Sequence, residues 1–106
     1  MFPFGSCRGS GYQTHSTKKR GCGWITVDEN NYYIMPVAKL GNADLYGAKL
    51  TGADLSHANL SDASLNRADL TGTDLTGAYL AGVKANSRTI CPNGKYYGTS
   101  GNDCPF

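Results

Sequence analysis

Cysteine and histidine are the residue types of this chain that could support metal or redox chemistry. They occur at Cys7, Cys22, Cys91, Cys104, His15 and His57. The sequence contains no C-x-x-C motif, and neither histidine lies at ligand spacing from a cysteine pair, although Cys7, His15 and Cys22 could together supply three zinc ligands. An even number of cysteines in the Gly-rich ends of a small chain is more typical of disulfide bonds. We therefore expect disulfides in preference to a metal site.

The cysteines fall into one pair at each end of the chain. Four cysteines allow three connectivities, and local pairing, Cys7–Cys22 and Cys91–Cys104, needs the least long-range coincidence. Disulfides predict an extracytoplasmic location: secreted, periplasmic or in an oxidising lumen such as the thylakoid lumen. The first residues, MFPFGSCRG, lack the apolar run of a secretion signal, so a mature form and a chain that never had a signal both stay open.

Composition and charge exclude several function classes. At 106 residues the chain has room for one domain, and no stretch is apolar for long enough to span a bilayer. The net charge of +2 gives no strong reason to expect a nucleic-acid partner. No motif supplies a nucleophile, a general base and an orienting group, so we expect neither an enzyme nor a bound cofactor.

The middle of the chain places Leu at every fifth position, and this spacing determines the expected fold. The register comprises Leu40, Leu45, Leu50, Leu55, Leu60, Leu65, Leu70, Leu75 and Leu80, continues through Ala85 to Ile90, and has Ala two places before most of these positions. A step of five residues turns an α-helix by about 140° net, which would scatter the Leu side chains around the cylinder. In a strand, alternate Leu side chains would face opposite sides.

A period of five is satisfied if each five-residue word forms one side of a coil and the chain turns a corner at its end. Four sides then close a turn of about 20 residues, and successive turns stack at the spacing of a β-ladder. Each Leu points to the axis, and only a small Ala fits beside it. The sequence therefore predicts a narrow all-β solenoid over residues 37–90 with the Leu register and Ile90 as its core.

The word resembles the A-(D/N)-L-x-x repeat of the pentapeptide-repeat family. The best copies are at residues 43–45, 53–55, 58–60 and 68–70. The resemblance implies a short right-handed quadrilateral β-helix, here with about 2.5–3 coils. It implies little about activity, because members of the family serve many roles. Some members mimic DNA and bind gyrase, which requires a long, strongly acidic rod. Five Asp residues balance five Lys and Arg residues between positions 38 and 90, so we do not expect that role here.

A turn of 20 residues stacks each residue on the one 20 positions later. Lys49 then falls under Asp69 as an exposed ion pair, and Asp54 falls under Asp74, a like-charge stack that could hold a cation weakly. A polar Cys-bounded loop at residues 91–106 is the other candidate cation site, although it lacks the ligand spacing of an EF-hand. The alternative function is accordingly that of a small secreted protein that binds a ligand or a cation.

Both ends of a solenoid need covering, and the flanks are predicted to cover them. Residues 1–36 form a basic, aromatic, Gly-rich N-terminal cap with a possible hairpin at 24–35, in which Trp24 and Tyr33 would cover the open core. Residues 91–106 form a capping loop, whose C-P-(D/N)-G…C pattern resembles the tails of secreted bacterial pentapeptide-repeat proteins.

We expect the chain to be a non-catalytic structural module that contacts a larger assembly through its ends and faces. A solvated loop is the simplest interpretation of the basic run KKR at residues 18–20, and docking on an anionic surface is the functional alternative. Aromatic residues near both termini are candidate anchors for a protein partner. The candidate partner contacts are Phe2, Phe4, Lys18, Lys19, Arg20, Trp24, Tyr96, Tyr97 and Phe106.

Overall fold

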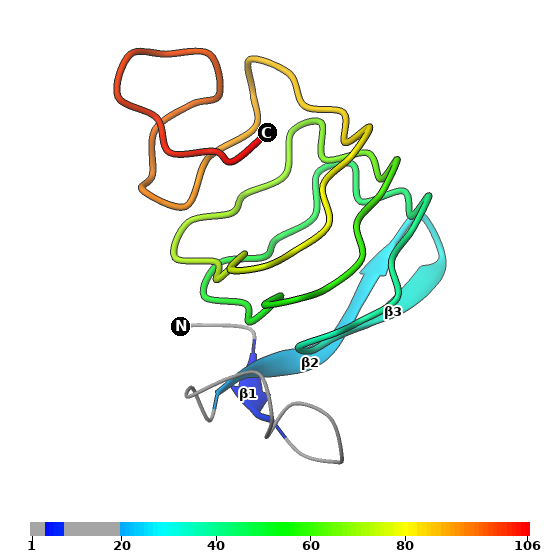
Figure 1. Cartoon of the computed structure of the whole chain (residues 1–106). Coiled ribbons are helices and arrows are strands. Elements are labelled where there is room, and N and C mark those ends of the chain that lie inside the picture. The colour runs from blue at the N-terminus through cyan, green and yellow to red at the C-terminus, as the bar shows by residue number, and fades with distance from the viewer. Residues whose placement is uncertain (1–3, 8–19) are drawn as a thin grey trace.

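The computed structural model of the chain describes residues 4–7 and 20–106. They form a β-helical coil with a hairpin at its N-terminal end and a disulfide-closed segment at its C-terminal end (Figure 1). Phe2, His15, Lys18 and Lys19 lie outside the described residues. Within the described ranges, no helix is long and apolar enough to cross a membrane.

The coil is held together by a parallel ladder in which residues 20 positions apart pair. Bridges join Lys39 to Asn59 and Asn59 to Tyr79, for example, and the same spacing recurs on the neighbouring sides. Around one such bridge, the Leu60 N–H donates to the Tyr79 carbonyl at 2.8 Å and the Tyr79 N–H donates to the Ala58 carbonyl at 2.9 Å. One turn of the ladder therefore takes four five-residue words.

Each word ends in a tight corner. The Ala63 N–H donates to the Leu60 carbonyl at 2.9 Å, and Asp62 between them has a positive φ of 60°. A positive φ at the third residue of a turn is the signature that favours Gly. Gly72 occupies the same corner position with φ 70°. These corners explain why the fifth residue of the word is often Gly.

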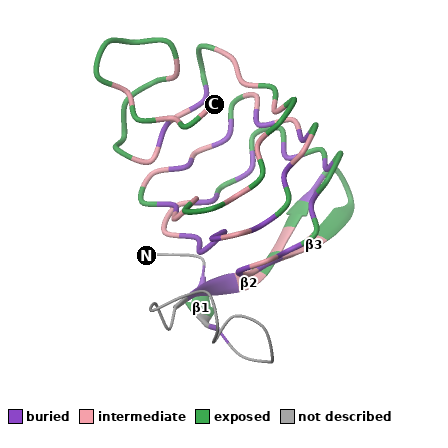
Figure 2. Ribbon diagram, viewed as in Figure 1, coloured by how far each residue is buried: buried purple, intermediate pink, exposed green. Residues whose placement is uncertain are grey.

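The apolar core runs along the coil axis. All the register residues from Leu45 to Leu70 have no exposed surface, and the Ala residues beside them are also buried. Leu75 and Leu80 lie on the same register but are only partly buried, because no further coil covers them. Figure 2 shows buried positions recurring along the coil, while the C-terminal segment is mostly exposed.

The register shifts by one residue before the C-terminal segment, so Ile90 differs from the predicted core position. Ile90 pairs with Asp69, 21 positions earlier, and its side chain is partly exposed. Cys91 takes the axial place above Leu70 and is fully buried, as is Thr89 in the place of the small residue. The last word therefore contains six residues in place of five.

The side chain of Asn86 repairs the ladder at this insertion. On a regular corner the Gly47 N–H donates to the Asn66 backbone carbonyl at 2.9 Å. At the equivalent place, 20 residues later, the Arg67 N–H donates instead to Asn86 Oδ1 at 3.1 Å. The Arg88 N–H donates to the same oxygen at 3.0 Å. The amide oxygen thus replaces a backbone acceptor that the extra residue has displaced.

The N-terminal region forms a small antiparallel sheet of β1 (Gly5–Ser6), β2 (Arg20–Val27) and β3 (Asn30–Ile34), in the order β1-β2-β3. A two-residue turn, Asp28-Glu29, joins β2 to β3, and both residues have positive φ, 48° and 69°. This conformation suits a two-residue hairpin because its twist matches that of the strands.

The hairpin attaches to the first coil through Gly21. The Asp54 N–H donates to the Gly21 carbonyl at 2.8 Å. A Cβ at residue 21 would lie 2.8 Å from Asp54 N, and the φ of 109° also favours Gly. The close approach of the two backbones therefore depends on the absence of a side chain.

Strand alternation decides which hairpin residues cover the core. Ile34, Val27 and Phe4 are buried in the same cluster as the axial Leu residues. Trp24 has the opposite parity and is 69% exposed, so it does not cover the open core as predicted. Tyr33, its cross-strand partner, is partly exposed on the same outer face.

Candidate functional site

The Asp and Asn residues of the repeat act chiefly as local hydrogen-bond acceptors. Asp69 Oδ1 accepts from the Thr71 N–H at 3.0 Å and from the Thr71 hydroxyl at 2.6 Å. Asp54 Oδ1 accepts from the Ser56 N–H and hydroxyl at 3.1 and 2.6 Å. Each carboxylate thereby fixes the corner two residues after it, as Asx turns do. This role accounts for the second letter of the repeat without any catalytic chemistry.

The predicted columns are present in the coil. Parallel bridges stack Lys49 on Asp69 and Asp54 on Asp74. Asp54 is fully buried, with its Oδ1 bound to Ser56. The carboxylates of this column therefore already take part in the hydrogen bonding of the coil.

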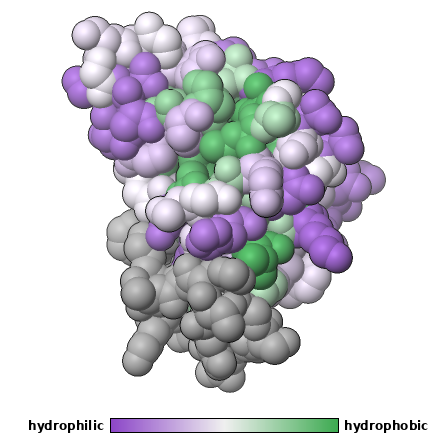
Figure 3. Space-filling view, in the orientation of Figure 1, coloured by the Kyte–Doolittle hydropathy of each residue, from purple (hydrophilic) through white to green (hydrophobic). Residues whose placement is uncertain are grey.

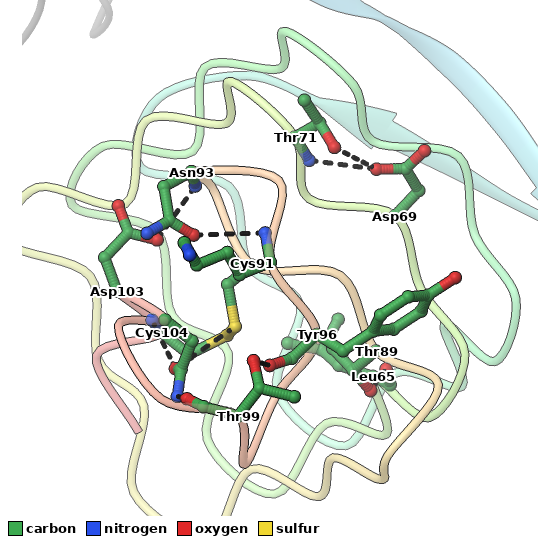
Figure 4. Close-up of a disulfide and its surroundings, with 12 residues drawn as sticks. Leu65, Asp69, Thr71, Thr89, Cys91, Asn93, Tyr96, Thr99, Asp103 and Cys104 are labelled. Atoms are coloured by element: carbon green, nitrogen blue, oxygen red, sulfur yellow. Dashed lines mark hydrogen bonds between the residues drawn. A yellow bond between two sulfur atoms is a disulfide. The ribbon is translucent and has the colours of Figure 1, made fainter.

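The C-terminal segment is a closed loop held by the Cys91–Cys104 disulfide (Figure 4). The Asn93 N–H donates to Asp103 Oδ1 at 2.8 Å, and Asn93 Nδ2 donates to the Gly101 carbonyl at 2.7 Å. The Cys104 N–H donates to Asn102 Oδ1 at 3.1 Å. The polar side chains of this loop thus hold its own backbone, which favours a rigid structural loop.

Aromatic residues also attach this segment to the coil. Tyr96 forms an antiparallel bridge with Ile90, and the Tyr97 N–H donates to the Thr89 carbonyl at 2.8 Å. The rings of Tyr97 and Phe106 stack with centroids 5.7 Å apart. Of these aromatic rings, that of Tyr96 is the most exposed.

The outer face of the hairpin carries the most exposed aromatic pair among the described residues. The Trp24 and Tyr33 rings lie directly across the two strands and meet edge to face, with centroids 5.1 Å apart. Beside them the Thr26 hydroxyl donates to Asn31 Oδ1 at 2.6 Å. We call these four residues the hairpin face. Exposed aromatic rings beside a polar pair are typical of a protein contact site.

A shallow groove lies between the hairpin and the first coil. Its volume is about 380 Å³, and its lining includes Ile25 and Val27 from β2 and Tyr46 and Lys49 from the coil. The Arg67 guanidinium lies 5.9 Å from the centroid of the Tyr46 ring. This cation–π contact fixes the aromatic side chain at the edge of the groove.

The predicted partner contacts separate into different environments. Trp24 and Tyr96 are exposed, while Tyr97 and Phe106 are partly buried against each other. Phe4 is 3% exposed and belongs to the core, which contradicts its prediction as a contact. Phe2, Lys18, Lys19 and the side chain of Arg20 lie outside what the structure describes.

Both disulfides have the predicted local connectivity, Cys7–Cys22 and Cys91–Cys104. No group of three His, Cys, Asp or Glu side chains in residues 4–7 and 20–106 has the arrangement of a metal site. The Cys7, His15 and Cys22 alternative does not hold, because the two thiols bond to each other.

Sequence reasoning missed Asn86, Thr26 and Asn31. The signal for Asn86 was present: if the five-residue register continued, Arg88 would occupy the small inward position two places before Ile90. A charged side chain does not fit that place, so the sequence itself indicates a break. For the hairpin face, the apolar alternation of Ile25 with Val27 indicates that Trp24 points outward.

Comparison with known proteins agrees with this geometry. Residues 38–77 match the family described as pentapeptide repeats, in eight copies. The middle of this chain therefore consists of pentapeptide repeats. Among solved structures, it is similar to a pentapeptide repeat protein, Rfr23, from the cyanobacterium Cyanothece 51142, with 39% sequence identity and a TM-score of 0.50. The match covers 51% of this chain and 37% of that pentapeptide-repeat protein. A search of curated proteins finds no match.

Proposed function

We propose that this pentapeptide-repeat protein is a non-catalytic scaffold that binds a protein partner through its hairpin face. The observation that carries the proposal is Trp24, an indole ring 69% exposed on a strand that is otherwise held firmly to the coil. Exposed Trp and Tyr residues on a rigid surface are common anchors of protein interfaces.

Rigid attachment of the hairpin supports this proposal. The Cys7–Cys22 disulfide ties β2 to the residue after β1, and the Gly21–Asp54 hydrogen bond ties it to the coil. The inner side of the hairpin is anchored in the core by Ile34. A preorganised face loses little conformational freedom when it binds, which favours affinity.

The shape of the coil and its closed ends also suit a rigid scaffold. We infer a right-handed quadrilateral coil of about 2.5–3 turns, whose disulfide-closed ends act as caps. Two intramolecular disulfides fit an oxidising environment. The scaffold is accordingly assigned to an extracytoplasmic compartment, where its partner would also be found.

The test uses a photo-cross-linking amino acid at position 24 of the full chain, expressed in its native host. The proposal predicts one dominant cross-linked protein, which is lost when Tyr33→Ser is added. A matched control places the same group at Lys39, an exposed residue of the first coil. Equal cross-linking from positions 24 and 39, or none from either, would show that the hairpin face is not a contact site.

A further inference from the structure

The groove between the hairpin and the first coil is bordered by an unpaired β edge of that coil. In the second coil, the Asp69 N–H donates to the Ala48 carbonyl and the Asp69 carbonyl accepts from the Leu50 N–H, both at 2.9 Å. Lys49 holds the same place one coil earlier, so its N–H and carbonyl point toward the hairpin end. Neither group has a hydrogen-bond partner among the described residues. An open strand donor and acceptor form a template for another strand.

The hairpin closes this edge of the coil only in part. One word after Lys49, the Asp54 N–H donates to the Gly21 carbonyl of β2 at 2.8 Å. Farther along β2 the hairpin and the coil separate, and the groove opens between them beside Lys49. Its volume of about 380 Å³ lies within the range of about 300–1,000 Å³ that is typical of ligand sites. The space can therefore take a short extended peptide at the open edge.

The inner side of the hairpin gives the groove an apolar lining. Ile25 packs against the axial core and is partly buried, and Val27 is buried in that core. Figure 3 shows a small hydrophobic area at the hairpin end of the visible face, with hydrophilic side chains beside it. In a strand paired with Lys49, the residues on either side of the one opposite Lys49 would point inward, because strand side chains alternate. Apolar residues suit these two inward positions.

The charges around the groove favour an acidic residue opposite Lys49. The Lys49 side chain is exposed and forms no ion pair within the part of the chain that the structure describes. Asp69, which is stacked on it in the next coil, holds the corner that follows. The Arg67 guanidinium at the Tyr46 ring adds a second positive charge at the edge of the groove. Asp28 of the hairpin turn is the one acidic residue among the described lining residues. Opposite charges directly across a strand pair are stabilising.

We propose that the groove binds an extended segment of a partner protein in which an acidic residue stands between two apolar residues. The backbone of the segment pairs with Lys49, its carboxylate lies beside the Lys49 ammonium, and its apolar side chains pack toward Ile25 and Val27. In such strand addition the main chain supplies affinity and alternate side chains supply specificity. The site does not depend on the exposed ring of Trp24, which is not part of the lining.

Selection of random heptapeptides displayed on phage, against the folded full chain, tests the sequence pattern. The enriched peptides are expected to carry Asp or Glu between two apolar residues. Lys49→Glu should change the enriched central residue to Lys or Arg, and thermal unfolding checks that this exposed substitution leaves the fold intact. Lys39→Glu, an equally exposed change on another side of the same coil, should leave the pattern unchanged. No enrichment, or the same pattern from the wild type and Lys49→Glu, would overturn the proposal.

Hydrogen exchange of single amides, measured by NMR with a synthetic peptide of the most enriched sequence, tests the backbone pairing. The peptide should slow exchange of the Lys49 amide by about tenfold or more. It should leave the amide of Asp44 unchanged, because that amide also lacks an acceptor among residues 4–7 and 20–106 but does not line the groove. Trp24→Ser should bind the peptide as the wild type does, which separates this site from the hairpin face.

Three results of this experiment would contradict strand addition in the groove. One is equal protection of the Lys49 and Asp44 amides, and another is loss of peptide binding in Trp24→Ser. The third is protection of the Lys49 amide that rises with protein concentration in the absence of peptide, because it would identify a second copy of the chain as the occupant.

Discussion

Replacing Leu60 by Ala should destabilise the protein much more than the same replacement at Leu80. Leu60 has no exposed surface and lies on the axis between the first and last coils, whereas Leu80 is partly exposed on the open last coil. Truncation of Leu60 removes three buried carbon atoms, about 2.4 kcal/mol of transfer free energy. The cavity left behind raises the loss to about 3–4 kcal/mol. The partly solvated Leu80 should lose about half of that or less.

Urea unfolding followed by circular dichroism, with both disulfides intact, measures the two losses. The slope of the free energy against urea should stay equal in the wild type and both variants, so that the midpoints report stability. Equal destabilisation by the two variants would refute the reasoning, because it would mean that the last coil is covered as fully as the middle one. A Leu60→Ala variant with an unchanged midpoint would show that Leu60 does not lie on the axis.

Three further predictions concern the corners and the ends of the coil. Asn86→Ala leaves the Arg67 N–H without its acceptor and should cost about 1–2 kcal/mol of unfolding free energy. Asn66→Ala should cost under about 0.5 kcal/mol, because residue 66 makes its ladder bond through the backbone carbonyl, which the substitution keeps. Equal costs would contradict the repair role of Asn86. Gly72→Ala forces Ala to φ 70° and should lower the free energy of unfolding by about 1–2 kcal/mol. Gly41→Ala, where φ is not positive, should be neutral or stabilising in the same urea unfolding experiment. Destabilisation at both positions would refute the corner assignment. Intact-mass spectrometry without reductant should find the chain lighter than its reduced form by four hydrogen atoms, and four free thiols would contradict both disulfides.

The sequence predicts the coil well because its period follows from simple geometry. A Leu at every fifth position can share one axis only if each word forms a side, and the small residue two places before each Leu follows from the narrow interior. The pairing of neighbouring cysteines is equally local. These features depend on residues close together in the chain or repeated many times, so a pattern suffices to reveal them.

Single departures from the pattern were harder to predict. The extra residue before Ile90 moves Cys91 to the axis, and the ladder tolerates it because Asn86 supplies a side-chain oxygen in place of a carbonyl. That substitution depends on three-dimensional placement and has no repeated signal. The outward direction of Trp24 depends on strand parity, and composition alone favoured its burial. The burial of Phe4 depends on β1 reaching β2, a pairing of only two residues.

Hydrogen exchange of individual backbone amides, measured by NMR at low protein concentration, tests most directly whether the scaffold is a coil closed in its middle and open at its last turn. The amides of Leu60 and Leu65 should exchange slowly, because they donate to the next coil at 2.8 and 2.7 Å. The amides of Leu75 and Leu80, which donate to no acceptor among the described residues, should exchange rapidly. Strong protection of Leu80 at low concentration would contradict the open end, and rapid exchange of Leu60 would contradict the 20-residue ladder itself.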